Sequence, residues 1–399
     1  MKCLFIKEGL KTGGTTSSFL NLLTALSKDT VHQFDVWIND ADAYDLSVIP
    51  EGIDIVYLPS LQRAFSLPKE RFGRAIELIR DGQLFETIYS RHNNFDKDKL
   101  IPSVQKQSLA RAKHKARIDL LHYDVVISWE EFFPCYLLAE RVRAKHKIAW
   151  IHPDYKGCGF RKELDREPFS KLNAVVAVSD SSKKSLEESF PDYKEKFWGI
   201  RNCINYKKIC ELSTKKPSDM IIGEETSLVT VARIQNISKA LDRAIRIAER
   251  LKANNLKFKW YVIGGGEDLN AMVSLSKQRG VQDRIFFLGE RKNPYGYIRY
   301  ADIFVMQSYY EGCPMAVDES LALKTPVIAS NYQAAREQVD EKYGMIVNND
   351  EESIFRTLQE VLLNPEIVAR WKKNLESVDL LGFDDYQPFI NLIERVCRC

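Results

Sequence analysis

The segment "KCLFIKEGLKTGGTTSSFLNLLTALSKDTVHQFDVWIN" (residues 2–39) decides the fold, because it contains two strand patterns with a helix pattern between them. Its apolar ends, 2–7 and 34–39, are typical of buried parallel strands. The apolar residues between them have the i, i+3, i+4, i+7 spacing of one helix face: Phe19, Leu22, Leu23 and Leu26. A strand, a helix and a strand in this order predict a doubly wound parallel sheet.

The same alternation continues along all 399 residues, in two series separated by the polar stretch 213–225. Further apolar, β-branched runs predict strands at 53–58, 123–129, 147–152 and 174–179, and then at 227–232, 258–264, 284–289, 302–307 and 326–330. The clearest helix pattern of the second series covers 238–252. We therefore expect an α/β protein with two Rossmann-like domains that face each other across a cleft, the default place for a ligand.

Composition narrows the class of protein. Hydrophobic residues make up 45% and charged residues 28%, and the formal net charge of +3 gives no indication of nucleic-acid binding. No apolar run approaches the ~20 residues of a membrane span, and the apolar start is too short for a signal peptide. The eight cysteines form no Cys-x-x-Cys pair, so we expect reduced thiols and a cytoplasmic location.

One region is more basic than the rest. Residues 61–120 contain thirteen Lys or Arg against seven Asp or Glu, and 69–80 has the pattern of a basic amphipathic helix. Such a helix can lie on an anionic membrane surface. Taken alone, the stretch fits a solvated helix packed on the first domain better. The motif "DKD" (96–98) lies in a polar stretch and is interpreted as solvated surface, not as a metal site.

Ligands of doubly wound sheets bind beyond the carboxyl ends of the strands, and the first such junction is "KEGLKTGGTTSSFL" (7–20). Gly13 and Gly14 allow a close approach of the backbone, and Thr15 or Thr16 can cap the following helix, whose N-terminus attracts phosphate. The loop is not a Walker A motif, because Thr15 stands where the lysine is needed.

At the second junction, "TVARIQNISKALDRAI" (230–245), Arg233 leaves a strand and Lys239 follows Ser238, the expected helix cap. A lysine in the first helical turn opposes the helix dipole, at a cost of ~0.3–1 kcal/mol, unless an anion lies in front of it. Arg233 and Lys239 can then bind one diphosphate together. An exposed lysine that tolerates the dipole is an equally good interpretation of this stretch.

The third junction is "YYEGCPMAVDE" (309–319), where Pro314 suits the first turn of a helix. Glu311 then lies in the loop and Glu319 in the helix, and the free N–H groups of Met315 and Ala316 point to the same space. An ordinary surface turn with capping acids is one interpretation. A nucleotide sugar is the other, because it offers a diphosphate to the N–H groups and hydroxyls to both acids.

His152 ends the predicted strand 147–152 and precedes a proline. A histidine at the end of a strand is more often structural than catalytic. Its place at a carboxyl edge, in the domain opposite Arg233 and Glu311, favours a functional role.

These motifs, in this order, resemble the retaining family-four glycosyltransferases, which have two Rossmann domains in the GT-B fold. "EGCPMAVDE" matches the family's Glu-x7-Glu motif, and the accompanying motifs cover nearly the whole chain: the glycine loop at 13–14, "KIAWIHPDY", "VAVSD" with "IRNCIN", Arg233 with Lys239, "VIGGGE" (262–267) and "PVIAS". The resemblance implies an acceptor-binding domain at 1–205, a linker at 206–222, a nucleotide-sugar domain at 223–377, and a helical segment at 378–399 that packs back on the first domain.

The resemblance also implies roles for single residues. Glu311 is expected to contact the hydroxyls of the transferred sugar and Glu319 the ribose, while Arg233 and Lys239 bind the diphosphate. The backbone at Gly14, Met315 and Ala316 assists, and Gly289 marks the turn beside the base. His152 is expected beside the donor sugar. Two departures, Lys324 and "NYQAARE" (331–337), replace glycines of the family and leave the donor's identity open.

The reaction implied is retaining, metal-independent hexosyl transfer from a nucleotide diphosphate sugar, with no cofactor. Cations and helix N–H groups stabilise the departing diphosphate, and no second carboxylate suggests a double displacement. The expected acceptor is a carbohydrate or a lipid-linked precursor of a surface polysaccharide such as capsule, lipopolysaccharide or exopolysaccharide. The enzyme is expected in the cytoplasm, with peripheral association with an anionic membrane through 61–120 and "RVRAKHK" (141–147) as a further possibility.

Three alternatives use the same cleft or the same fold. A nucleotide-sugar epimerase or a phosphorylase shares the architecture, but the full ordered set of motifs argues against both. A non-catalytic nucleotide-sugar-binding subunit would not be expected to keep Arg233, Lys239, Glu311 and Glu319 together. A nicotinamide oxidoreductase fits worst, because "IGGGED" is not Gly-x-Gly-x-x-Gly.

Overall fold

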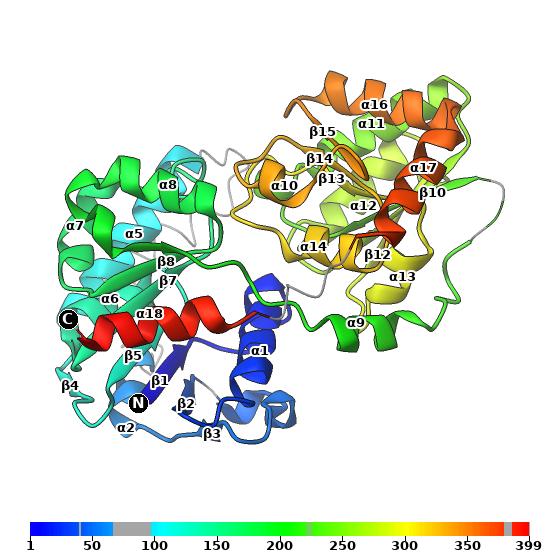
Figure 1. The fold of residues 1–399 in the computed structure, drawn as a ribbon. Coiled ribbons are helices and arrows are strands. Elements are labelled where there is room, and N and C mark those ends of the chain that lie inside the picture. The colour runs from blue at the N-terminus through cyan, green and yellow to red at the C-terminus, as the bar shows by residue number, and fades with distance from the viewer. Residues whose placement is uncertain (40, 67–96, 222, 224, 379–384, 399) are drawn as a thin grey trace. The chain divides into compact units, whose positions relative to one another are not determined.

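The computed structural model describes residues 1–39, 41–66, 97–221, 223, 225–378 and 385–398. The chain divides into two compact units (Figure 1). The N-terminal unit consists of residues 1–203 and 385–399, and the C-terminal unit consists of residues 204–384. Each unit has its own sheet and its own hydrophobic core.

The N-terminal unit is built on a seven-stranded parallel sheet with the order β3-β2-β1-β5-β7-β8-β9. Its strands are β1 (Lys2–Lys7), β2 (Gln33–Ile38), β3 (Asp54–Ile55), β5 (Val125–Ser128), β7 (His146–Ile151), β8 (Ala174–Ala177) and β9 (Phe197–Gly199). A separate two-stranded pair joins β4 (Ile118–Asp119) and β6 (Val142–Arg143). Every pairing is parallel, as the near-continuous apolar runs predict.

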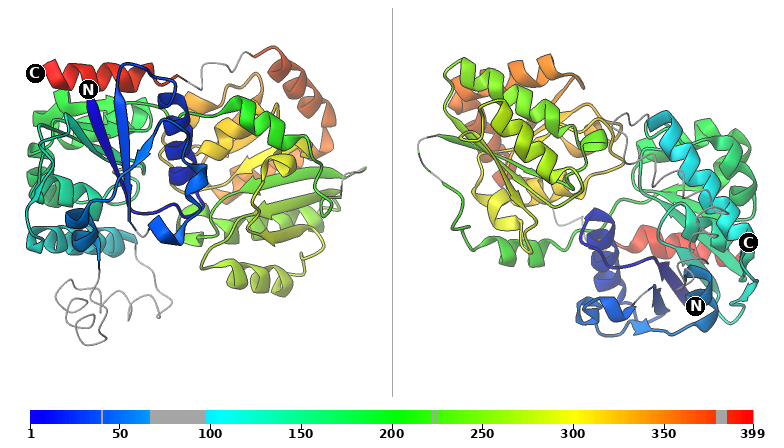
Figure 2. Two further views of the ribbon diagram at one scale, coloured as in Figure 1. Left: turned by 90° about the horizontal axis from the view of Figure 1, so that it is seen from below. Right: turned by 180° about the vertical axis from the view of Figure 1, so that it is seen from behind.

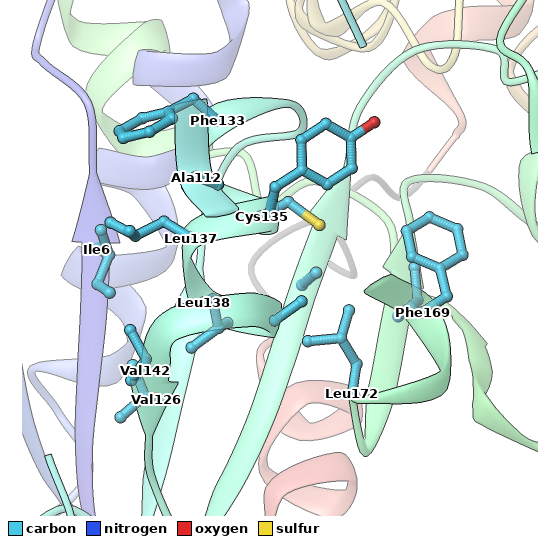
Figure 3. Close-up of a cluster of buried hydrophobic side chains, with 14 of the residues drawn as sticks. Ile6, Ala112, Val126, Phe133, Cys135, Leu137, Leu138, Val142, Phe169 and Leu172 are labelled. Carbon is cyan, nitrogen blue, oxygen red and sulfur yellow. The ribbon is translucent and has the colours of Figure 1, made fainter. Parts of the chain in front are cut away.

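Helices lie on both faces of this sheet (Figures 1 and 2). They are α1 (Gly14–Leu26), α2 (Pro59–Phe65), α5 (Lys97–His114), α6 (Phe133–Arg141), α7 (Lys162–Ser170), α8 (Asp180–Ser189) and α18 (Gln387–Arg398). Short 3-10 turns occur at Ala41–Ala43, Leu46–Val48 and Pro191–Lys196. On one face α6 packs its apolar side, including Leu137 and Leu138, against Val126 of β5 (Figure 3).

The last helix, α18, belongs to the N-terminal unit although about 180 residues of the other unit precede it. Phe389 carries the contact: its ring lies 5.6 Å from the ring of Phe5 in β1 and 5.9 Å from that of Trp150 in β7. Phe389, Ile393 and Val396 are buried, so the helix completes the core on the second face of the sheet (red in Figure 1).

The C-terminal unit is built on a six-stranded parallel sheet with the order β12-β11-β10-β13-β14-β15. Its strands are β10 (Thr226–Val231), β11 (Phe258–Ile263), β12 (Ile285–Gly289), β13 (Ile303–Met306), β14 (Val327–Ser330) and β15 (Gly344–Val347). Its helices are α9 (Tyr206–Ser213), α10 (Asn236–Lys239), α11 (Leu241–Ala253), α12 (Leu269–Gln278), α13 (Tyr295–Tyr300), α14 (Met315–Ala322), α15 (Ala335–Gln338), α16 (Glu351–Leu363) and α17 (Pro365–Glu376).

Some elements differ from the expectation. The predicted strand 53–58 shortens to β3, and the strands β9 and β15 were not predicted at all. The predicted helix 238–252 is two helices, because Ala240 has the left-handed angles φ 51° and ψ 45° and ends α10. The segment expected as a linker, 206–222, begins with α9, which packs against α13 and α14.

Both sheets share one topological feature that places the site. In each, the chain starts at a central strand, winds outward, and returns to the other side of that strand. The reversal lies between β1 and β5 in the N-terminal unit and between β10 and β13 in the C-terminal unit. Ligands of open α/β sheets bind at such switch points, at the carboxyl ends of the strands.

Candidate functional site

The carboxyl ends of β10 and β13 bring together two residues of the predicted donor site. Lys239 Nζ lies 2.5 Å from Glu311 Oε1, although 72 residues separate them in the chain. The pair is sheltered from solvent, since the side chains are 21% and 9% exposed. A sheltered pair keeps more of its Coulomb attraction than an exposed one. The switch point therefore holds a cation and a carboxylate in mutual contact.

Lys239 is not in the first turn of a long helix, so the expected conflict with the helix dipole was wrong. It is the last residue of the four-residue α10, and Ala240 in the left-handed conformation separates it from α11. Ser238 is likewise not a cap: Ala240 occupies the cap position of α11, and the amide of Asp242 in its first turn donates to Asn236 Oδ1 at 2.9 Å. A lysine at the C-terminal end of a helix is stabilised by the helix dipole.

A buried arginine holds the two loops that carry this pair. Arg243 of α11 is 2% exposed, and its guanidinium donates to the carbonyl of Gln307 and to Asn349 Oδ1. Gln307 in turn donates to the carbonyl of Lys239 at 2.9 Å. Backbone contacts continue the connection, because the Tyr309 amide donates to the Ser238 carbonyl. None of these supporting residues was predicted. One feature of the sequence indicated them: Arg243 is a basic residue on the apolar side of the helix pattern at 241–251.

Arg233 follows β10, as predicted, and lies at the surface. Its guanidinium is 3.3 Å from Glu267 Oε2, and the side chains are 68% and 49% exposed. The pair is therefore weak and easily exchanged for another anion. The glycine loop before Glu267 packs directly on the Arg233 loop: a Cβ on Gly264 would lie 1.9 Å from the Ala232 carbonyl oxygen. Glycine is required there to bring the two loops together.

The start of α14 offers backbone donors, as predicted. Pro314 is the residue before the first turn, and the Val317 amide donates to its carbonyl at 3.1 Å. Within the described residues the amides of Met315 and Ala316 have no hydrogen-bond partner. Free N–H groups at the start of a helix are ready donors to an anion.

Glu319 lies in the middle of α14 and is 6% exposed. Burial raises the pKa of its carboxyl group to about 7, and the hydrogen bond from Tyr295 acts in the opposite direction. The Tyr295 hydroxyl donates to Glu319 Oε1 at 3.3 Å. A buried carboxyl that titrates near neutral pH is a frequent feature of functional sites. Nothing in the sequence distinguished Tyr295.

Gly289, predicted beside the nucleotide base, ends β12 with φ 73°. Its carbonyl accepts from the Gly264 amide at 3.0 Å, so the end of β12 is joined to the glycine loop at the same edge of the sheet. A positive φ favours glycine at this position.

In the N-terminal unit Gly13 and Gly14 begin α1, and a Cβ on either would meet nothing within 4 Å. Gly13 itself is the cap residue, so the expectation that Thr15 or Thr16 caps the helix was wrong. The carbonyl of Thr15 instead accepts from the Trp129 indole at 3.0 Å, which joins α1 to the end of β5.

His152 follows β7, and its ring is fixed by a hydrogen bond of 2.8 Å between Nε2 and the Trp129 carbonyl. A carbonyl only accepts, so Nε2 carries the proton and Nδ1 keeps its lone pair. Burial lowers the pKa of the imidazole to about 4, and Lys7 adds to this effect. His152 is therefore neutral at physiological pH and offers an acceptor, not an acid.

The departures from the family pattern have local explanations. Lys324 has φ 64°, which accounts for a preference for glycine there, and its Nζ donates to the Val378 carbonyl at 2.8 Å. In 331–337 the buried Tyr332 donates to Gln338, which donates to the Pro314 carbonyl at 3.1 Å. These contacts help to fix Pro314, the residue before α14.

Other predictions fall partly outside the described residues. The basic helix pattern at 69–80 and Asp96 of "DKD" belong to that part of the chain. In the residues that are described, no group of three or more His, Cys, Asp or Glu could hold a metal ion. In the same residues, every helix is too short or too polar to cross a membrane.

Comparison with protein families finds a match within the C-terminal unit. Residues 214–378 match the family described as "Glycosyl transferases group 1". The chain is 22% identical to the putative glycosyltransferase EpsF of Bacillus subtilis, over 97% of this chain and 94% of EpsF. It is 34% identical to the O-antigen biosynthesis glycosyltransferase WbnH of Escherichia coli, over 41% of this chain and 49% of WbnH.

A third relative has a more specific name. The N-acetylgalactosamine-N,N'-diacetylbacillosaminyl-diphospho-undecaprenol 4-alpha-N-acetylgalactosaminyltransferase of Campylobacter jejuni is 23% identical, over 52% of this chain and 56% of that protein.

Two solved structures are similar over almost the whole chain. HepE of Anabaena, solved in complex with UDP and glucose, has a TM-score of 0.67 at 13% identity, over 99% of this chain and all of HepE. Sucrose-phosphate synthase of Thermosynechococcus elongatus has a TM-score of 0.67 at 14% identity, over 100% of this chain and 98% of that one. At such low identity the likeness concerns the fold alone. It confirms the predicted fold class, two doubly wound domains of the GT-B type.

Proposed function

We propose that this chain is a glycosyltransferase of group 1 that moves one sugar from a nucleotide diphosphate sugar to a carbohydrate or lipid-linked acceptor, with retention at the anomeric carbon. The observation that carries the proposal is the sheltered contact of Lys239 with Glu311 at the switch point of the unit that matches the family. A binding module for an anion alone has no use for a carboxylate against its cation.

The contact suits a ligand with an anionic and a hydroxyl-bearing part. When the diphosphate binds, its oxygens compete for Lys239 and for the exposed Arg233, and the free amides of Met315 and Ala316 add two neutral donors. Glu311 then loses its partner and accepts from hydroxyls of the sugar. Exchange of one charge-assisted contact for another keeps both groups satisfied in the bound state.

The same groups serve the reaction. Negative charge builds on the departing diphosphate as the sugar becomes cation-like, and fixed positive charge with free N–H groups stabilises that state. No carboxylate is assigned as a nucleophile, so we propose departure and attack on one face of the sugar. His152, neutral with Nδ1 as acceptor, is assigned to a hydroxyl of the donor sugar.

The acceptor class is proposed from the relatives. The name of one relative refers to O-antigen biosynthesis, and the name of another includes a diphospho-undecaprenol acceptor. We therefore place this chain in the assembly of a surface polysaccharide, on a carbohydrate or lipid-linked precursor.

A donor assay tests the proposal. Purified protein is incubated with UDP-, GDP- and ADP-sugars, with and without excess chelator, and release of nucleoside diphosphate is measured. We expect release from one donor class in wild type, with or without chelator, and a loss of at least 100-fold in Glu311→Gln. Glu341→Gln, which changes an exposed glutamate of the same unit, is the matched control.

Two outcomes contradict the proposal. Unchanged release in Glu311→Gln removes that residue from the site. Formation of a free epimeric sugar, or of a sugar phosphate from glycan and phosphate, assigns the chain to an epimerase or a phosphorylase instead. Proton NMR of the first product distinguishes retention from inversion.

A further inference from the structure

The switch point of the N-terminal unit also has a cavity. A space of about 330 Å³ opens where β1 and β5 end, and its polar and aromatic lining includes Glu8, Thr15, Arg111, Glu130, Glu131 and Phe132. Ligand pockets commonly have volumes of about 300–1,000 Å³, so this one has room for a small group. Because doubly wound sheets bind ligands at this position, the cavity lies where a second substrate is expected.

The three glutamates of the cavity have different surroundings. Glu130 accepts from the Lys7 ammonium group and, at 2.8 Å, from the amide of Glu8, so both of its oxygens are engaged. Within the described residues the carboxylate of Glu8 has no hydrogen-bond partner. Glu131 accepts a long bond of 3.4 Å from the His152 amide. Glu8 and Glu131 therefore keep acceptor capacity for a ligand, and Glu130 supports the loop.

The cation of the cavity is already engaged. Arg111 of α5 donates to the Phe65 carbonyl at 2.8 Å, and its guanidinium carbon lies 3.8 Å from the centre of the Phe133 ring. The Lys7 ammonium group pairs with Glu130, which leaves the carboxyl groups of Glu8 and Glu131 beside one engaged guanidinium. When ionised, these two groups disfavour a phosphate, since like charges repel at short range. The favoured guest is uncharged and rich in hydrogen-bond donors.

Phe132 gives the cavity a rigid apolar wall. Its ring stacks on that of Phe160, with centroids 5.2 Å apart and planes 11° from parallel. Its backbone has φ 59°, an unusual value for a bulky residue. An aromatic face beside two carboxyl groups with remaining acceptor capacity matches a sugar ring, which has apolar C–H groups on its faces and hydroxyls around its edge.

We propose that this cavity binds the terminal saccharide of the acceptor through its hydroxyl groups, with Glu8 and Glu131 as acceptors and Phe132 as the apolar wall. The assignment rests on the proposed function and adds the chemical part of the acceptor that is recognised here. A lipid diphosphate, where the acceptor has one, is excluded from the cavity by its charge. Glu131 also contacts the His152 amide, so the saccharide lies at the same strand edge as the predicted catalytic histidine.

The test is a binding experiment on the whole chain in the presence of a saturating concentration of UDP, GDP or ADP, whichever binds wild type and so fills the donor site. Saturation-transfer NMR is recorded with methyl glycosides of glucose, galactose, N-acetylglucosamine and N-acetylgalactosamine, and with inorganic pyrophosphate as the anionic probe. We expect at least one glycoside to bind. Its Kd should rise at least tenfold in Glu131→Gln and in Phe132→Leu, which keeps the bulk but removes the aromatic face.

The controls separate this proposal from the proposed function. Glu195→Gln changes an exposed glutamate of the same unit and should bind the glycoside as wild type does. The affinity for the nucleoside diphosphate that binds wild type should be equal in all variants, which also shows that they fold. If UDP, GDP and ADP all fail to bind wild type, the proposed function fails first. If one of them binds but no glycoside does, or if the variants bind the glycoside unchanged, the saccharide site is rejected. Pyrophosphate binding that weakens in Arg111→Met would identify an anion site and also overturn it.

Discussion

The carboxylate of Glu311, in the loop after β13, lies 2.5 Å from the ammonium group of Lys239, the last residue of α10. Buried Arg243 supports the contact indirectly, because its guanidinium donates to the Gln307 carbonyl and Gln307 donates to the Lys239 carbonyl. A ligand that separates the pair must supply an anion to Lys239 and hydrogen-bond donors to Glu311, since either group left buried without a partner costs free energy.

Lys239→Ala tests the phosphate role of that pair. We expect the affinity for a nucleoside diphosphate to fall about 10- to 100-fold, since a charge-assisted hydrogen bond contributes ~1.5–3 kcal/mol. The measurement is isothermal titration calorimetry at a temperature where both proteins are folded. Lys257→Ala, at an exposed lysine of the same unit, is the control. Equal affinity in both variants would remove Lys239 from the diphosphate site.

Glu319 gives the C-terminal unit a predictable response to pH. Burial raises the pKa of its carboxyl from 4.5 to about 7, so ionisation is less favourable in the folded than in the unfolded chain. The resulting contribution to stability is complete below pH 4.5 and is lost as pH rises through 7, with a slope of at most ~1.4 kcal/mol per pH unit.

Glu319→Gln removes this response. We expect the thermal midpoint of wild type to fall relative to that of the variant between pH 4.5 and 7.5, because the amide does not ionise. Scanning calorimetry in buffers of matched ionic strength gives the difference at each pH. A difference that is constant across this range would show that Glu319 has an ordinary pKa in the folded chain.

A separate binding measurement tests whether Glu319 accepts hydrogen bonds from the ribose. If the carboxylate accepts from ribose hydroxyls, the nucleoside diphosphate that binds wild type should bind more tightly than its 2′- or 3′-deoxy analogue, and Glu319→Gln should reduce that preference. Tyr295→Phe should have a smaller effect of the same kind, because its hydroxyl orients Oε1 of Glu319. A preference that both variants retain in full would place the ribose elsewhere.

A buried carboxylate supports the N-terminal unit. Asp165 is 2% exposed and accepts from Tyr136, from Tyr155 at 2.6 Å and from Gln105 at 2.6 Å. Asp165→Ala leaves the hydroxyls of Tyr136 and Tyr155 without their acceptor and removes one of the two hydrogen bonds of Gln105 Nε2. Each unsatisfied buried donor costs ~1–3 kcal/mol. We expect destabilisation of about 3 kcal/mol or more, measured by urea unfolding. Asp192→Ala, at an exposed aspartate paired with Arg166, should leave the midpoint unchanged.

The fold could be predicted from the sequence because most strands are marked by an apolar run, and these runs recur along the chain. The apolar run 2–7 coincides with β1, and 302–307 and 326–330 contain β13 and β14, since strands buried on both faces need continuous apolar side chains. The strands β9 ("FWG") and β15 ("GMIV") have apolar runs of only three and four residues, which are too short to stand out in the sequence. The break at Ala240 could not be seen, because alanine is the strongest helix former and only tertiary contacts impose a left-handed conformation on it.

The site was predictable only in part, for a related reason. Four site residues could be found because ligands of open α/β sheets bind at the carboxyl ends of strands. These residues follow strands in the sequence: Arg233, Lys239, Glu311 and Glu319. The residues that orient them, Arg243 and Tyr295, lie in helices and act through contacts that sequence spacing does not encode. The capping of α1 was misjudged because Thr15 and Thr16 have the right chemistry, but Gly13 occupies the cap position.

Lys324 allows a test of backbone strain in the C-terminal unit. Its φ of 64° costs a non-glycine residue ~1–2 kcal/mol, while its Nζ gains a hydrogen bond of 2.8 Å to the Val378 carbonyl. Lys324→Gly removes the strain and the bond together, so we expect a stability within about 1 kcal/mol of wild type. Lys324→Ala keeps the strain and loses the bond, and should be less stable than Lys324→Gly by about 1 kcal/mol. Urea unfolding of the three proteins measures both differences; an alanine variant as stable as the glycine variant would show that the left-handed conformation is not imposed at this position.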